Sequence, residues 1–142
     1  MKLRAATRGS PLAMWQTNHI AALLEKYGYQ VEPVIVETGG DKDQVSPLHE
    51  IGGQGIFVKE VQSCVIHGRA DFAVHSLKDL PSDTPSELVL AAVPDRGDPR
   101  DALVGSTLED LKPEARVATG SIRRKSQLAE IRPEISFHEL RG

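Results

Sequence analysis

The sequence passes from a strand pattern into a polar loop at Phe72-Ala73-Val74-His75-Ser76-Leu77-Lys78-Asp79-Leu80-Pro81. Residues 72–74 are apolar, and Pro81 prevents any helix or strand from continuing through the loop. In α/β proteins, ligands bind beyond the carboxyl ends of strands. Ser76, Lys78 and Asp79 therefore offer groups that can hold an anionic ligand and move a proton. The alternative is a polar turn in which Ser76 and Asp79 only accept hydrogen bonds from backbone amides.

The composition is that of a soluble globular protein with an aliphatic core. Its 142 residues suffice for one domain, or for one domain and the start of a second. The net charge of −3 argues against a general nucleic-acid binder, so anion binding must depend on local clusters of Arg and Lys. Cys64 is the single cysteine, which excludes an intrachain disulfide, and its place on the apolar face of a predicted helix favours burial. No apolar run is long enough for a signal peptide or a membrane span, and we therefore expect a cytoplasmic protein.

Up to Val93 the sequence alternates between strand and helix patterns. Helices are predicted at residues 11–27 and 56–67, where apolar residues recur at helical spacing. Strands are predicted at residues 3–7, 31–36, 72–74 and 88–93. The glycine-rich segment 38–55 lies outside this pattern, and a loop of that length is typical of a lid over a binding site.

Residues 94–101 combine prolines, a glycine and charged residues, which is typical of a crossover between lobes. Beyond it we predict strands at residues 102–104, 116–119 and 136–140, a short helix after Ser106 or Thr107, and a helix at residues 121–131. The chain is therefore expected to be an α/β protein. Domain 1 would span residues 1–94, an interdomain crossover residues 95–101, and the start of domain 2 residues 102–142.

Two helix starts have the features of anion-binding sites. Thr119-Gly120-Ser121 leads from a strand into a helix whose first turn carries Arg123 and Arg124, and Arg8-Gly9-Ser10 repeats the arrangement before the first helix. Free amides at a helix start attract anions, and arginine adds two donors that match a carboxylate or phosphate. The alternative is an ordinary solvated helix face. A cleft that closes on a small polyanion is the function these features favour.

Several motifs, in this order and spacing, resemble porphobilinogen deaminase, also called hydroxymethylbilane synthase. They are Ala6 to Ala13, Gly52 to Glu60, Val74 to Pro81, Asp98 to Ala102, Thr119 to Gln127 and Leu140-Arg141-Gly142. The resemblance implies a transferase of tetrapyrrole (haem) biosynthesis that condenses four porphobilinogen molecules head to tail, with release of ammonia, on a cysteine-linked dipyrromethane cofactor. It also implies a two-lobed fold with mixed sheets, similar to type II periplasmic binding proteins. Here domain 1 would lack its returning strand, and the second lobe would be truncated.

The resemblance assigns roles to residues by position. Asp79 matches the catalytic carboxylate, which also contacts the cofactor. The cofactor-binding positions are Ser76, Lys78, Asp79, Thr119, Ser121, Arg123 and Arg124. The positions that bind carboxylates of the substrate or of the growing pyrrole chain are Arg8, Ser10 and Arg141. No metal, nucleic acid or membrane is implied. The family is usually monomeric, and self-association of this chain stays open.

The sequence departs from the family at several positions. Glu50 and Gln54 stand where members often have Lys, Gly39 where Arg is common, and Gly120 where Ser is frequent. Family chains are about twice as long, and Cys64 does not match the cysteine that carries the cofactor. We therefore expect this chain to be a fragment without turnover of its own. The alternative is a non-catalytic module of the periplasmic-binding type that binds small anions.

Overall fold

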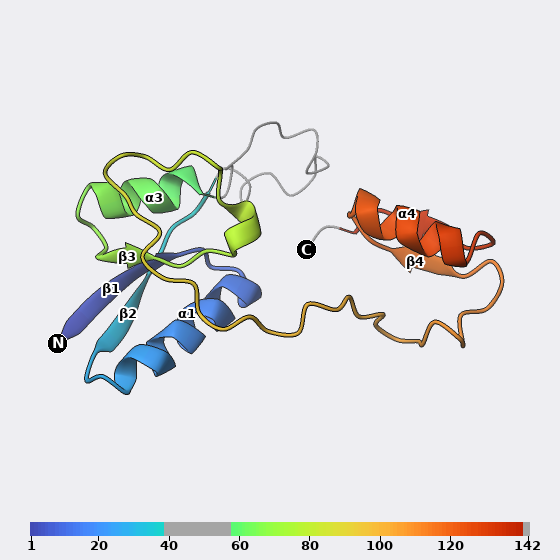
Figure 1. Cartoon of the computed structure of the whole chain (residues 1–142), viewed down its shortest axis with the longest axis horizontal. Helices are drawn as coiled ribbons and strands as arrows, with labels where there is room; N and C mark the ends of the chain where they lie inside the picture. The colour runs from blue at the N-terminus through green and yellow to red at the C-terminus, as the bar shows by residue number, and fades with distance from the viewer. Residues whose placement is uncertain (39–57, 141–142) are drawn as a thin grey trace. The chain divides into compact units, whose positions relative to one another are not determined.

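The computed structural model describes residues 1–38 and 58–140, which form two compact units, Met1–Ala91 and Ala92–Gly142. Each unit has a parallel β-sheet with helices in the connections between its strands (Figure 1). The α/β prediction is therefore confirmed. Both sheets in the described residues are parallel, and no mixed sheet is present among them. No helix in the described ranges is long and apolar enough to cross a membrane.

The first unit is built around the central strand β1 (Lys2–Thr7). β1 pairs in parallel with β2 (Gln30–Ile35) on one side and with the short β3 (Phe72–Ala73) on the other. Its last three residues, Ala5, Ala6 and Thr7, are completely buried. Small, fully buried side chains on successive positions are expected of a strand that is covered on both faces of its sheet.

Helices α1 (Pro11–Glu25) and α3 (Lys59–Ile66) cover the two faces of this sheet (Figure 1). On the α3 face, Ala6 packs with Val61 and Cys64, which are both fully buried. On the α1 face, the buried hydroxyl of Thr17 donates to that of Thr7 at 2.8 Å. The α3 contact confirms the burial expected of Cys64, whose thiol is part of the core.

Helix ends follow the sequence signals. α1 begins with Ser10 as the capping residue and Pro11 in the first turn, the residue types that favour these two positions. Gly28 and Gly68 have φ values of 81° and 68°, the left-handed conformation that glycine adopts without a steric cost. The N-terminal boundary predicted for the second helix, residue 56, lies outside the described residues, as does the glycine-rich segment from residue 39 onward.

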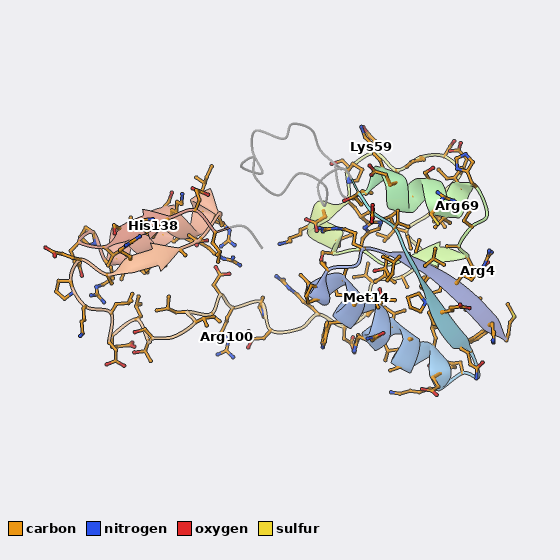
Figure 2. All side chains as sticks on the ribbon, turned by 180° about the vertical axis from the view of Figure 1, so that it is seen from behind. Arg4, Met14, Lys59, Arg69, Arg100 and His138 are labelled. Atoms are coloured by element: carbon orange, nitrogen blue, oxygen red, sulfur yellow. The ribbon has the colours of Figure 1, made fainter. Side chains whose placement is uncertain are left out.

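An ion pair ties β1 to the residue that precedes β3. The guanidinium of Arg4 (Figure 2) contacts both carboxylate oxygens of Asp71, at 2.8 and 3.3 Å, and the Arg4 amide donates to the same carboxylate at 2.7 Å. The Asp71 amide in turn donates to the Arg4 carbonyl at 2.8 Å. These hydrogen bonds hold the pKa of the Asp71 carboxyl below its usual range, chiefly through the Arg4 side chain.

This ion pair predicts a pH-dependent contribution to stability. A carboxyl whose pKa is lower in the folded than in the unfolded state stabilises the fold above the unfolded pKa of about 3.9, and loses that contribution as the pH falls through the folded pKa. Asp71→Asn should therefore lower the urea midpoint at pH 7, and the difference from the unsubstituted chain should shrink towards zero on acidification below pH ~4. Asp83→Asn, at an exposed position, is the control. A midpoint difference that stayed constant with pH would contradict the prediction.

The second unit contains one β–α–β arrangement. β4 (Arg116–Ala118) leads into α4 (Ile122–Ile131), and β5 (Ser136–His138) pairs with β4 in parallel. Arg132, directly after α4, donates to the carbonyl of Leu108 at 2.5 Å and to that of Leu111. These bonds attach the turn that precedes β4 to the end of the helix.

Three predicted elements are not present in the part of the chain that the structure describes. Residues 88–93 and 102–104 form no strand, and the segment after Thr107 is a turn, not a helix. An apolar segment becomes a strand only when a partner strand pairs with it; Val89 and Val104 are 82% and 94% exposed. The Thr107 hydroxyl does accept from the Asp110 amide at 3.2 Å, as a helix cap would, but Pro113 follows too soon for a helix to form.

Candidate functional site

The start of α1 and the end of β3 line one small cavity in the first unit. Its volume is about 40 Å³, room for a carboxylate group or a few waters, since one water needs about 10–15 Å³. The described residues that line it are Arg8, Ser10, Leu12, Ala13, Gln16, Val74, His75, Ser76 and Asp79. We refer to this cavity as the α1–β3 pocket. Four residues predicted to form a site, from two distant segments, thus come together here: Arg8, Ser10, Ser76 and Asp79.

The parallel pairing of β1 and β3 explains why these four residues lie close together. β1 and β3 run in the same direction, so their carboxyl ends lie at one edge of the sheet. The Val74 amide donates to the Ala6 carbonyl at 3.1 Å and extends the pairing by one residue. The chain leaves β1 at Arg8 and leaves β3 at His75, and the polar residues that follow each strand become neighbours.

The α1 side of the pocket is electropositive. The Ser10 hydroxyl accepts from the Ala13 amide at 3.3 Å and so begins the helix. No acidic residue lies in the first turn of α1, so no side chain of that turn offsets the positive end of the helix dipole. Together with the Arg8 guanidinium, this end of the pocket suits a carboxylate.

The β3 side supplies hydroxyl and carboxylate groups. Ser76 is half-buried and precedes a single turn of 3₁₀ helix, η1 (Leu77–Asp79), which the Asp79 amide closes on the Ser76 carbonyl at 2.9 Å. The Gln16 side-chain nitrogen donates to the Ser76 hydroxyl at 2.8 Å across the pocket. Lys78 also lies in η1, but it is exposed and is not among the described residues that line the pocket.

His75 is the least exposed titratable group of the pocket's β3 side. Burial is the main cause that lowers the pKa of its imidazole; the charge of Arg8 acts in the same direction, and that of Asp79 opposes it. The imidazole is therefore neutral at pH 7. Its Nε2 atom is buried and has no hydrogen-bond partner in the described structure. His75 thus adds a polar but uncharged side chain to the pocket lining.

A second group of predicted residues lies in the second unit, at the start of α4. The Ser121 amide donates to the Thr119 hydroxyl at 3.2 Å, and the Ser121 hydroxyl accepts from the Arg124 amide at 3.4 Å. A Cβ atom at Gly120 would lie 2.7 Å from the Leu140 carbonyl oxygen, closer than real contacts permit. This close approach gives the glycine at position 120 a physical reason.

Asp101 pairs with both arginines of α4. The Arg124 Nε atom donates to Asp101 Oδ1 at 2.8 Å, and an Arg123 nitrogen lies 3.3 Å from Oδ2. The Arg124 hydrogen bond is the main reason why the pKa of the Asp101 carboxyl is lowered. The carboxylate thus fixes both guanidinium groups in orientation. We refer to Asp101, Arg123 and Arg124 as the α4 arginine cluster.

The sequence did not predict Gln16 or Asp101, which make side-chain contacts to predicted residues of these sites. Gln16 is an ordinary polar residue of a helix until its contact with Ser76 is seen. Asp101 belongs to the predicted crossover and to the Asp98 to Ala102 motif, but neither assigns it a role in binding. The remaining predicted site residue, Arg141, lies outside the described residues, as do Gly39, Glu50 and Gln54. In the described ranges, no three His, Cys, Asp or Glu side chains are grouped so as to hold a metal ion.

Comparison with known proteins gives one consistent family. Residues 3–142 match the family model described as "Porphobilinogen deaminase, dipyromethane cofactor binding domain". The chain is 51% identical to the porphobilinogen deaminase of a Nitratiruptor species, over 100% of this chain and 47% of that protein. It is 44% identical to that of Sulfurimonas denitrificans, over 99% and 47%, and 49% identical to the chloroplastic protein of Euglena gracilis, over 99% and 31%. The chain thus spans about half the length of the bacterial relatives.

Proposed function

Because this chain belongs to the porphobilinogen deaminase family, we propose that it supplies the catalytic carboxylate and much of the anion-binding surface of a hydroxymethylbilane synthase. The complete enzyme condenses four porphobilinogen molecules head to tail and releases ammonia at each step. The observation that carries the proposal is the α1–β3 pocket, in which Asp79 lies with Arg8, Ser10 and Ser76.

Asp79 is proposed to move the protons of the reaction. Each condensation forms a carbon–carbon bond between the aminomethyl carbon of one pyrrole and the free ring carbon of the next. The amine must gain a proton to leave as ammonia, and the attacked ring carbon must lose one. An exposed carboxyl group in a pocket lined by Arg8 is placed to accept one proton and return another.

Arg8 and Ser10 are proposed to bind the carboxylates of the substrate, together with Arg141. Porphobilinogen carries an acetate and a propionate, and each pyrrole therefore presents anions at its rim. The electropositive start of α1 suits one such group, and the pocket volume of about 40 Å³ admits a carboxylate but not a pyrrole ring. The rings themselves would thus lie outside the pocket, with Asp79 at its edge facing them.

The matched family domain is the one that binds the dipyrromethane cofactor. When bound, the cofactor supplies the pyrrole end from which the product chain is extended. The residues proposed to hold it are Ser76, Lys78, Asp79, Thr119, Ser121, Arg123 and Arg124. Their hydroxyl, ammonium and guanidinium groups fit a carboxylate-rich ligand, and the Asp101 contacts orient two of the guanidiniums. Cys64 is not a candidate for attachment because its side chain is completely buried.

We also propose that the two units correspond to the two lobes of a fold similar to type II periplasmic binding proteins. The division after Ala91, close to the predicted crossover at residues 95–101, supports this architecture. So does the repeated β–α–β arrangement with an anion-binding helix start in each unit. A cytoplasmic, monomeric enzyme is the corresponding proposal for location and assembly.

Turnover by a full-length version tests this function. The chain is extended past Gly142 with the remaining half of a bacterial relative, and porphobilinogen is added. A linear tetrapyrrole and release of one ammonia for each porphobilinogen consumed are expected, measured by mass spectrometry and an ammonia assay. The C-terminal half alone is the control, and the intact relative is the positive reference. An extended chain that is folded but consumes no porphobilinogen would contradict the proposal.

A further inference from the structure

We infer that Gln16 is a positioning residue of the α1–β3 pocket, and that it makes the Ser76 hydroxyl a hydrogen-bond donor to a bound carboxylate. The inference deepens the proposed function and rests on it for the identity of the ligand. Gln16 projects from the second turn of α1, and Ser76 follows β3, sixty positions further along the chain; their side chains meet at 2.8 Å. Both residues line the pocket, and both are half-buried.

The direction of this hydrogen bond determines what Ser76 can bind. A serine hydroxyl has one proton to donate and lone pairs to accept with. The Gln16 amide nitrogen can only donate, so Ser76 is the acceptor in this contact. The Ser76 proton is then directed elsewhere, and the hydroxyl donates no hydrogen bond to any described residue. A hydroxyl held in this way favours a ligand oxygen that carries negative charge.

The rest of the pocket agrees with an anion at that place. Arg8 and the start of α1, which has no acidic residue in its first turn, provide positive potential, and the neutral His75 adds no negative charge. Asp79 carries the acidic group of the pocket's described lining, and its side chain makes no hydrogen bond to the Ser76 hydroxyl. A neutral amide at position 16 therefore orients the serine without adding a negative charge that would repel the carboxylate.

Three substitutions separate this role from a merely structural one. Gln16→Leu removes the donor and leaves the Ser76 hydroxyl free to rotate. Gln16→Glu keeps the size of the side chain but turns the donor into an acceptor, which takes up the Ser76 proton and repels a carboxylate. Ser76→Ala removes the group through which Gln16 acts. Gln62→Leu is the matched control, because Gln62 is a half-buried glutamine of α3 that is absent from the pocket.

The measurement is the binding of porphobilinogen to the 142-residue chain, followed by NMR titration, with thermal unfolding of each variant in parallel. Hydrogen bonds to charged groups contribute about 1.5–3 kcal/mol, or roughly a 10- to 150-fold change in affinity, and loss of their alignment should remove a part of this. We expect about tenfold weaker binding for Gln16→Leu and a larger loss for Gln16→Glu. In the Ser76→Ala background, Gln16→Leu should have almost no further effect.

The outcomes are distinguishable from those of the function test. If porphobilinogen does not bind to the unsubstituted chain, or if Gln16→Leu and Gln16→Glu bind it like the Gln62→Leu control, the inference is overturned. An undiminished effect of Gln16→Leu in the Ser76→Ala background overturns it as well, because the glutamine would then act by another route. Turnover by the extended chain is measured separately, and its absence would count against the proposed enzyme activity instead.

Discussion

Asp79→Asn in the extended, full-length chain is expected to lower the kcat of tetrapyrrole formation by about 100-fold or more, since positioned acid–base groups contribute roughly 10²–10⁴-fold. Asparagine has the shape of aspartate and can still make hydrogen bonds, but it can neither accept nor return a proton at neutral pH. The KM for porphobilinogen should therefore change far less than kcat. Steady-state kinetics with the purified variant separate the two parameters.

The control for this experiment is Asp83→Asn, which removes a carboxylate from an exposed position outside the pocket lining, a short distance further along the chain. Both variants should keep the thermal stability of the unsubstituted protein, because Asp79 is exposed and its backbone amide, not its side chain, closes the η1 turn. Unchanged turnover of Asp79→Asn would remove the role assigned to this carboxylate.

Local signals were sufficient to predict the elements that frame the site. The helix starts near Ser10 and Ser121 and the strand that ends at Thr7 depend on residues within a few positions of one another, and all three predictions are confirmed. The proximity of Ser10 and Ser76 was not predicted; it results from the parallel pairing of β1 with β3, because parallel strands end at the same edge of a sheet.

The predictions that were wrong or missing concern interactions between residues that are distant in the sequence. The segments around Val89 and Val104 have strand-like composition, but pairing depends on a partner that composition does not reveal. Likewise, Gln16 and Asp101 are polar residues whose importance comes from Ser76 and Arg124, far along the sequence. Their side-chain contacts arise only when the fold brings these segments together.

Arg124→Leu in the full-length chain is expected to prevent stable loading of the dipyrromethane cofactor. The Arg124 guanidinium contacts Asp101 through two nitrogens, both at 2.8 Å, so its plane is fixed before any ligand arrives. Each charge-assisted hydrogen bond that it makes to a ligand carboxylate contributes about 1.5–3 kcal/mol, and its removal should weaken binding roughly 10- to 150-fold. Intact-protein mass spectrometry measures the fraction of molecules that carry the cofactor.

Arg124→Lys distinguishes charge from geometry. Lysine keeps the positive charge but lacks the planar fork that contacts Asp101 and a carboxylate together, so loading should be intermediate between arginine and leucine. Arg96→Leu, which removes an exposed arginine of the same unit outside the α4 arginine cluster, should load normally. Full loading of Arg124→Leu would show that this guanidinium does not hold the cofactor. If the lysine and leucine variants lose cofactor loading equally, the positive charge alone is not sufficient. The ligand would then require the guanidinium geometry that Asp101 sets.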